Sequence, residues 1–152
     1  MSIVYIGIGS NIGNRQENCR KAIRQLYLRG VKVVKESSMI ETEPWGVTDQ
    51  PCFINMAVEA ETDLAPENLL TALKDIEAAM GRTDAVRWGP RVIDLDILFY
   101  DDIVLDTPEL KIPHPYLHER DFVLIPLAEI APEKIHPVLQ KSVRRLCSDL
   151  PA

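Results

Sequence analysis

The stretch that decides the fold, residues 87–98, reads Arg87-Trp88-Gly89-Pro90-Arg91-Val92-Ile93-Asp94-Leu95-Asp96-Ile97-Leu98. A tight turn rich in cations runs directly into an apolar strand that carries two acids. Because side chains alternate along a strand, we expect Ile93, Leu95 and Ile97 on one face and Asp94 and Asp96 on the other. Two strand positions separate Cα atoms by about 6.5–7 Å. Carboxylates at that spacing can hold one metal ion, or two ions with a bridging oxygen.

The two acids have two explanations. Solvated carboxylates on an exposed strand face are common, and without a cation they would repel each other and raise the pKa of one of them. The residues before the strand favour a binding site instead. Arg87 and Arg91 offer guanidinium groups for anions, and Trp88 offers a stacking surface. Acids for a metal beside arginines for anions predict a site for a polyphosphate–metal complex.

The composition predicts a single domain, 1–152, with a full hydrophobic core, because 152 residues with 46% hydrophobic and 26% charged content are ordinary for a globular protein. The net charge of −6 argues against a broad nucleic-acid surface, since phosphate backbones are bound by clustered Lys and Arg. The N-terminus lacks signal-peptide features, and no apolar run reaches membrane-spanning length. Cys19, Cys52 and Cys147 are widely spaced, which indicates reduced thiols. We therefore expect a cytoplasmic protein that binds neither nucleic acid nor membrane.

Hydrophobic periodicity predicts an α+β fold in the order strand, helix, strand, strand, helix, strand. The strands are expected at 2–9, 31–42, 52–61 and 92–100, and the helices at about 15–29 and 65–80. This βαββαβ order is the ferredoxin-like arrangement, an antiparallel sheet with both helices on one face. A C-terminal extension, 101–152, is expected to add a hairpin near 102–112 and short helices near 119–130 and 139–149. It could form a wall over the open face.

Several polar residues have ordinary structural explanations on pattern alone. Gly7-Ile8-Gly9-Ser10-Asn11-Ile12-Gly13 departs from GxGxxG spacing, so a tight strand-to-helix turn is the better interpretation. His114 and His118 flank Pro115, which disfavours a helix, and no acid or thiol cluster completes a zinc site. Glu77 lies within the apolar face of the second helix, as a boundary residue or as a functional one.

Several aromatic residues and one amide residue also allow two interpretations. Phe53 and Phe122 could be core aromatics, and Trp45 a lid or a hydrophobic plug. Asn55 shares the face of Phe53 on an otherwise apolar strand, and a buried amide needs partners for both halves. A planar heterocycle could supply them, as could nearby backbone.

Taken together, these motifs resemble the 6-hydroxymethyl-7,8-dihydropterin pyrophosphokinase family of folate biosynthesis. The most specific motif is Arg87-Trp88-Gly89-Pro90-Arg91 followed by Asp94-Leu95-Asp96. The supporting matches are Thr42-Glu43-Pro44 with Gly46, Asp49-Gln50-Pro51, Asn55, Gly81-Arg82, Pro113-His114-Pro115, and Arg120 with Phe122. The resemblance covers nearly the whole chain.

The resemblance implies transfer of the diphosphate of ATP to the hydroxymethyl group of the pterin, with release of AMP. Asp94 and Asp96 would coordinate two Mg²⁺ ions on the triphosphate and, with Arg82 and Arg91, form the catalytic set. The residues implied for the pterin are Thr42, Pro44, Trp45, Phe53, Asn55 and Phe122, the two phenylalanines stacking on its ring. The residues implied for ATP are Glu77, Arg82, Arg87, Trp88, Arg91, Ile97, His114 and Arg120. The reaction needs alignment of the substrates and neutralisation of phosphate charge more than a covalent intermediate on the protein. We also expect the protein to be a monomer.

The chain departs from the family pattern in places. The loop 82–87 is short and carries Asp84 where relatives often have further basic residues. Phe53 lacks the hydroxyl of a tyrosine often found there, although stacking does not need it. Lys74 and Glu109 remain unassigned.

Two other functions are considered. Another Mg-dependent nucleotidyl- or glycosyltransferase could use the same Asp-x-Asp pair, but it would release pyrophosphate or a nucleoside diphosphate and would not need the pterin residues. A non-enzymatic ferredoxin-like binding module, such as an RNA binder, would want basic and aromatic residues across the sheet face. This chain places acids there instead.

Overall fold

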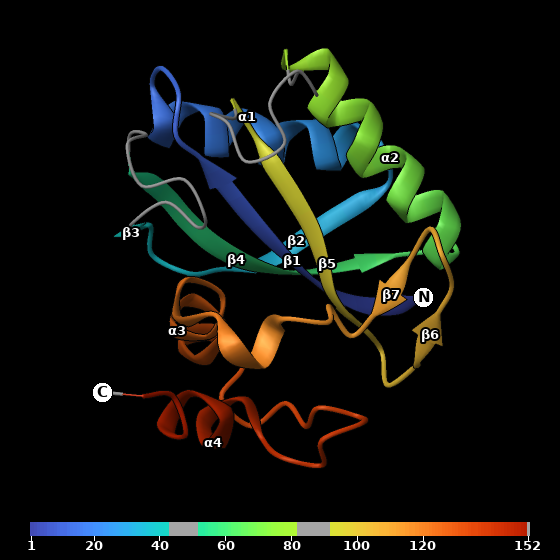
Figure 1. The fold of residues 1–152 in the computed structure, drawn as a ribbon. Coiled ribbons are helices and arrows are strands. Elements are labelled where there is room, and N and C mark those ends of the chain that lie inside the picture. The colour runs from blue at the N-terminus through green and yellow to red at the C-terminus, as the bar shows by residue number, and fades with distance from the viewer. Residues whose placement is uncertain (43–51, 82–91, 152) are drawn as a thin grey trace.

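The computed structural model describes residues 1–42, 52–81 and 92–151. Its main sheet contains β1 (Ser2–Ser10), β2 (Val31–Glu36), β3 (Ile40–Thr42), β4 (Phe53–Thr62) and β5 (Asp94–Tyr100). Two long helices, α1 (Arg15–Leu28) and α2 (Pro66–Ala79), connect these strands. The strands lie in the order β2-β4-β1-β5 with antiparallel neighbours, and β3 also pairs with β4. The predicted ferredoxin-like arrangement is confirmed (Figure 1).

The single strand predicted at 31–42 is wrong, because the chain forms two strands there. Glu36 pairs opposite Val58, and pairing resumes with Ile40 opposite Asn55. The chain takes four steps between these points while β4 takes three. One extra residue is therefore accommodated at 37–39 as a bulge, which interrupts the strand.

Each face of the sheet has its own hydrophobic core. On one face α1 and α2 pack over the strands, burying residues such as Leu26, Leu73 and Ile97. On the other face the C-terminal helices cover Leu98 and Phe99. Figure 1 shows α1 and α2 on one side of the sheet and α3 and α4 on the other. The expected placement of both long helices on one face, with the extension walling the other, is confirmed.

Local sequence explains where the long helices begin and end. The side chain of Asn14 accepts a hydrogen bond from the amide of Glu17 at 3.1 Å, which is an N-cap. Pro66 occupies the first turn of α2, where its missing N–H costs nothing. Gly30 and Gly81 follow the two helices with φ of +82° and +92°, a conformation that glycine adopts without strain.

The C-terminal extension contains the hairpin β6 (Leu105–Asp106) and β7 (Lys111–Ile112), the 3-10 turn η1 (Leu117–Glu119), and the helices α3 (Asp121–Ile130) and α4 (Val143–Ser148). The last helix is shorter than the predicted 139–149. Ser142 caps it by accepting from the amide of Arg145 at 3.1 Å. The preceding segment is folded around His136, whose Nδ1 accepts from the amides of Val138 and Leu139 at 3.1 and 3.0 Å.

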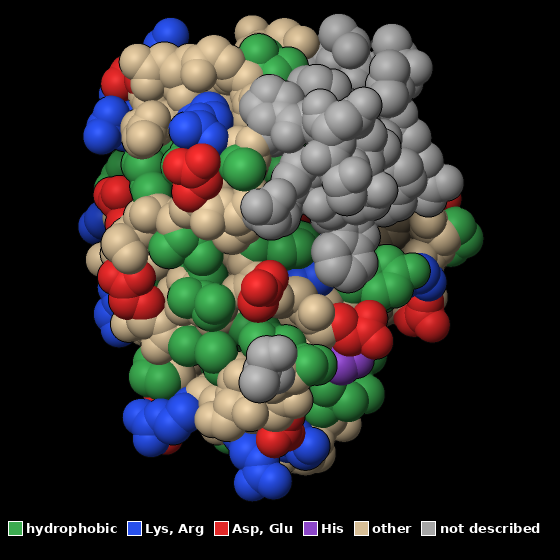
Figure 2. Space-filling view, turned by 60° about the vertical axis from the view of Figure 1, so that its left-hand side comes forward, with side chains coloured by type: hydrophobic (Ala, Val, Ile, Leu, Met, Phe, Trp, Pro, Cys, Tyr) green, Lys and Arg blue, Asp and Glu red, His purple; other side chains and the backbone are tan. Residues whose placement is uncertain are grey.

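The face of the molecule drawn in Figure 2 carries charged and hydrophobic side chains together, as a composition of 26% charged and 46% hydrophobic residues leads us to expect. On the face shown in Figure 2, Lys and Arg side chains are most frequent along the left margin and at the lower end, with others in the upper middle and at the right edge, and acidic and hydrophobic side chains lie among them. Within the described residues, no helix combines the length and the apolar character needed to cross a membrane.

Candidate active site

The strand register places the predicted acids and the predicted amide in one row. Gly9 of β1 pairs with Asp94 of β5 on one side and with Asn55 of β4 on the other. In the next row, Gly7 pairs with Asp96 and Ala57. Residues directly opposite each other share a face. The carboxylates and the amide therefore face the same side, with glycines between them.

A small cavity lies above these rows. It measures about 40 Å³ and is lined by Asn55, Asp94 and Asp96 from the sheet and by Arg120 and Phe122 from the start of α3. The guanidinium carbon of Arg120 lies 5.2 Å from the ring centre of Tyr116 and 5.4 Å from that of Phe122. Both distances are typical of cation–π contacts. The cavity thus combines acids, an amide and an aromatic ring stacked against a cation.

Asn55 is held in place by its neighbours. Its Nδ2 donates to Oγ1 of Thr42 at 2.6 Å. Its Oδ1 lies so close to Gly9 that a Cβ there would come within 2.8 Å of it, and within 3.4 Å of Cδ1 of Phe53. Thr42 and Phe53, both predicted for the pterin, are thereby grouped with Asn55, which lines the small cavity.

A second cavity of about 310 Å³ lies beyond β5, and Asp94 and Asp96 line it as well. Its other walls come from α2 and from the segment 108–115, which carries the loop of the hairpin. Ile97 and His114, both predicted for ATP, line this cavity. The two acids therefore belong to the wall that separates the cavities.

His114 offers a hydrogen-bond donor toward the acids. Its Nδ1 accepts from the amide of Tyr116 at 3.2 Å, and its Nε2 lies 4.0 Å from Oδ1 of Asp96. Burial, with a smaller contribution from the Arg120 charge, lowers the pKa of His114 to about 4. The imidazole is neutral at neutral pH, and because Nδ1 is an acceptor, its proton lies on Nε2.

Glu77 supports the acids from the helix side of the sheet. The residue is buried, and its Oε2 accepts from the amide of Leu95 at 2.9 Å. Leu95 lies between the two acids in sequence. The buried carboxylate therefore fixes the backbone that aims Asp94 and Asp96 toward the other face.

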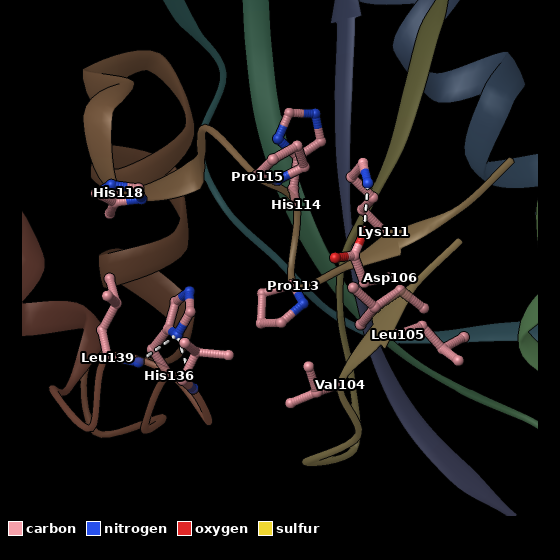
Figure 3. Close-up of a pocket in the computed structure, with 12 residues that line it drawn as sticks. Val104, Leu105, Asp106, Lys111, Pro113, His114, Pro115, His118, His136 and Leu139 are labelled. Carbon is pink, nitrogen blue, oxygen red and sulfur yellow. Dashed lines mark hydrogen bonds and ion pairs between the residues drawn. The ribbon is translucent and has the colours of Figure 1, made fainter. Parts of the chain in front are cut away.

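A third cavity, about 280 Å³, lies on the opposite side of the segment 111–115. Figure 3 shows His114 and Pro115 at one end of it and His136 and Leu139 at the other. His114 and Pro115 also line the second cavity. This segment is therefore a partition between the two.

The donor set at the shared wall fits Mg²⁺. This ion prefers oxygen ligands and is commonly bound by one or two carboxylates, with phosphates and waters completing the octahedron. Asp94 and Asp96 supply two carboxylates on one face, and both cavities reach them.

Not every predicted residue can be placed. Pro44, Trp45, Arg82, Arg87, Trp88 and Arg91 lie outside the described residues. Lys74 and Glu109, which were unassigned from sequence, line the second cavity. Spacing on α2 could have indicated Lys74, because it lies one turn from both Leu70 and Glu77. Glu109 lies in a hairpin loop, and no local pattern places such a loop against β5.

Comparisons with known proteins place the chain in one family. Residues 5–132 match the family model described as 7,8-dihydro-6-hydroxymethylpterin-pyrophosphokinase. The chain is 43% identical over 144 residues to the 2-amino-4-hydroxy-6-hydroxymethyldihydropteridine pyrophosphokinase of Aquifex aeolicus, covering 95% of this chain and 89% of the relative. It is 50% identical over 130 residues to the protein of the same name from Bacillus subtilis, covering 85% of this chain and 78% of the relative.

Larger proteins contain a similar unit. The mitochondrial folate synthesis bifunctional protein of Arabidopsis thaliana is 50% identical over 127 residues, which cover 84% of this chain but 23% of that protein. A crystal structure of Plasmodium falciparum HPPK-DHPS matches with a TM-score of 0.78 and 19% identity, covering 97% of this chain and 44% of the other. The structural match supports the fold, and the family model and the sequence relatives together show that the chain belongs to the 7,8-dihydro-6-hydroxymethylpterin-pyrophosphokinase family.

Proposed function

We propose that this chain transfers the diphosphate of ATP to 6-hydroxymethyl-7,8-dihydropterin, with ATP in the second cavity and the pterin in the small one. One observation carries the proposal: Asp94 and Asp96 line both cavities. A phosphoryl group positioned at these acids would be accessible to a nucleophile from the other side of the same wall. Transfer between two bound substrates requires this alignment.

The reaction needs charge neutralisation on the nucleotide side. The hydroxymethyl oxygen attacks the β-phosphorus of ATP and loses its proton to solvent. The bond from that phosphorus to the oxygen shared with the α-phosphate breaks, and AMP leaves with the electron pair. Asp94 and Asp96 would hold two Mg²⁺ ions, which when bound withdraw charge from the phosphates. His114 would donate from Nε2 to a phosphate oxygen, and Lys74 adds a cation at the same cavity.

The pterin side needs hydrogen bonds and stacking. Asn55 would pair with the ring edge through its amide, and Phe122 would stack on one face, with Phe53 proposed for the other. A volume of about 40 Å³ holds a few waters at most and is too small for a bicyclic ring. We infer that the side chains of α3, Phe122 and Arg120, move away from the sheet when the pterin binds.

That the protein acts as a monomer remains a prediction. The net charge of −6 favours a protein that does not bind nucleic acid, because phosphate backbones are bound by clustered Lys and Arg. A cytoplasmic location, where ATP is abundant, remains a prediction.

The proposal is tested by incubating the protein with Mg-ATP, with and without the pterin, and measuring AMP and the pterin diphosphate. We expect AMP only when pterin and Mg²⁺ are both present. Release of pyrophosphate or of a nucleoside diphosphate would instead support the alternative transferases. A double variant, Asp94→Ala with Asp96→Ala, should lose Mg-dependent ATP binding. Unchanged binding would contradict the metal role of these acids.

A further inference from the structure

Ser38, in the bulge between β2 and β3, contacts a carboxylate from the far end of the chain. Its amide lies 3.0 Å from each carboxylate oxygen of Glu129, and its hydroxyl donates to Oε2 of Glu129 at 2.8 Å. Hydrogen bonds to a charged acceptor are stronger than neutral ones. This contact links the bulge to α3.

The amide of Ser38 points away from β4, toward α3. Ser37 occupies the pairing groups of β4: its amide donates to the carbonyl of Ala57, and its Oγ accepts from the amide of Ala57, both at 2.9 Å. Ser38 follows directly, and its amide turns to Glu129 instead of to β4. Glu129 thus accepts from a backbone donor that the strand ladder does not use.

The bulge also decides which side chains of β3 lie beside Asn55. Side chains alternate, so a slip of one residue turns every side chain of a strand to the other face. In the observed register Thr42 pairs opposite Phe53 and accepts from Asn55. Without the extra residue, Glu41 would take the face of Thr42. A carboxylate would then replace a hydroxyl beside Asn55.

The position of Glu129 suggests a specific role. It lies in the last turn of α3, where a negative charge opposes the helix dipole and is unfavourable. The first turn of the same helix carries Phe122, which lines the small cavity. One helix therefore holds both the aromatic wall and the bulge that orients Thr42.

From these contacts we infer that Glu129 is a positioning residue for the pterin, acting through Ser38, Thr42 and Asn55. The inference rests on the proposed function, because it assigns the small cavity to the pterin. Glu129 does not touch the cavity itself, since it is absent from the residues that line it in the described structure. Because its contacts lead through Ser38 to Asn55, the effect of Glu129 is expected on pterin binding and not on ATP binding.

The test compares Glu129→Ala, Glu129→Gln and a matched control, Glu133→Ala. Glu133 is an exposed acid four residues further along, paired with Arg144 at 2.6 Å and remote from Ser38 in its contacts. For Glu129→Ala we expect the KM for the pterin to rise about three- to tenfold, as loss of one or two exposed hydrogen bonds predicts, with the KM for ATP unchanged. Glu129→Gln keeps an acceptor oxygen and should fall between Glu129→Ala and the wild type. Glu133→Ala should match the wild type.

A backbone measurement separates this role from general destabilisation. Amide hydrogen exchange should quicken at residues 38–42 in Glu129→Ala and stay unchanged on β1 and β5. An unchanged pterin KM in Glu129→Ala, or an equal rise in both KM values, would overturn the inference. If the wild-type protein formed no pterin-dependent AMP, the proposed function would fail instead, and the exchange result would still report on the bulge.

Discussion

Single residues set the shape of the small cavity, and Gly9 is the most sensitive of them. It lies between Asp94 and Asn55 in the sheet, and a Cβ at this position would approach Oδ1 of Asn55 to 2.8 Å. At Gly7 a Cβ would meet Cδ2 of Leu98 at 3.5 Å, an ordinary contact. The two glycines therefore tolerate a methyl group differently.

The resulting prediction concerns Gly9→Ala. Displacement of Asn55 should raise the KM for the pterin about tenfold or more, because small misplacements in a binding site have large kinetic effects. Gly7→Ala should change the same constant much less. Steady-state kinetics of both variants with varied pterin test this. An equal change in the pterin KM of both variants would contradict the proposed binding of the pterin by Asn55.

At the scale of elements, the pairing of α2 with β5 supports the acids from behind. Glu77 projects from α2 and accepts from the amide of Leu95 in the buried interior. Asp75 lies on the same helix but is exposed. These two acids make a matched pair for substitution.

Glu77→Ala should lower the free energy of unfolding by about 1–3 kcal/mol, because the buried amide of Leu95 loses an acceptor. It should also lower kcat, since Leu95 lies between Asp94 and Asp96. Asp75→Ala should change stability by less than about 0.5 kcal/mol, as expected for an exposed site. Urea unfolding and initial rates measure both quantities. A Glu77→Ala protein as stable and active as the wild type would exclude the supporting role.

A second prediction concerns the segment 131–142, where the titration of His136 makes the stability of the fold depend on pH. Burial, helped by the nearby His118, lowers the pKa of His136, whose Nδ1 accepts from two backbone amides. As pH falls below the unfolded value of about 6.5, the unfolded chain takes up a proton that the folded chain resists. Stability is therefore complete above that pH and decreases as the solution is acidified.

His136→Asn keeps an acceptor for the loop amides but does not titrate. The loss of stability between about pH 7.5 and about pH 5 should therefore be smaller in this variant than in the wild type. It should not vanish, because His114 shifts in the same direction. Urea unfolding at both pH values gives the comparison. An identical loss in both proteins would contradict a contribution from His136.

At the scale of the whole molecule, ligand binding should stabilise the fold through both cavities. Mg-ATP at about one hundred times its Kd should add roughly 2.7 kcal/mol to the free energy of unfolding. For a chain of this size that raises Tm by about 5–10 °C. The Asp94→Ala, Asp96→Ala double variant should lose most of this shift. Thermal denaturation with and without Mg-ATP measures it, and an equal shift in both proteins would refute the prediction.

Much of this fold could be predicted from local sequence. The alternation in 93–98 predicted which face carries Asp94 and Asp96, because it acts over a few residues. Asn14, Gly30 and Gly81 mark the helix ends through equally local chemistry. The break at 37–39 could not be predicted in this way. It depends on Ala57 in another strand and on Glu129, 91 residues from Ser38 in sequence.

The candidate site also has parts that local sequence predicts and parts that depend on residues distant in the chain. Asp94, Asp96 and Asn55 could be selected from their strands, but their meeting across Gly9 depends on strand register. Neither the loop of the hairpin nor the start of α3 carries a local signal for its tertiary contact. For this reason no local pattern places Glu109 at the second cavity or brings Glu129 to Ser38.

The placement of α3 over the sheet has a consequence for synthesis on the ribosome. The sheet and both acids are encoded within the first 100 residues, whereas the wall that bears Arg120 and Phe122 comes later. A nascent chain that has emerged only through β5 lacks both the segment 108–115, which lines the second cavity, and the aromatic wall of the small one. The site is therefore expected to be complete only after residues 101–130 have emerged and docked against the sheet.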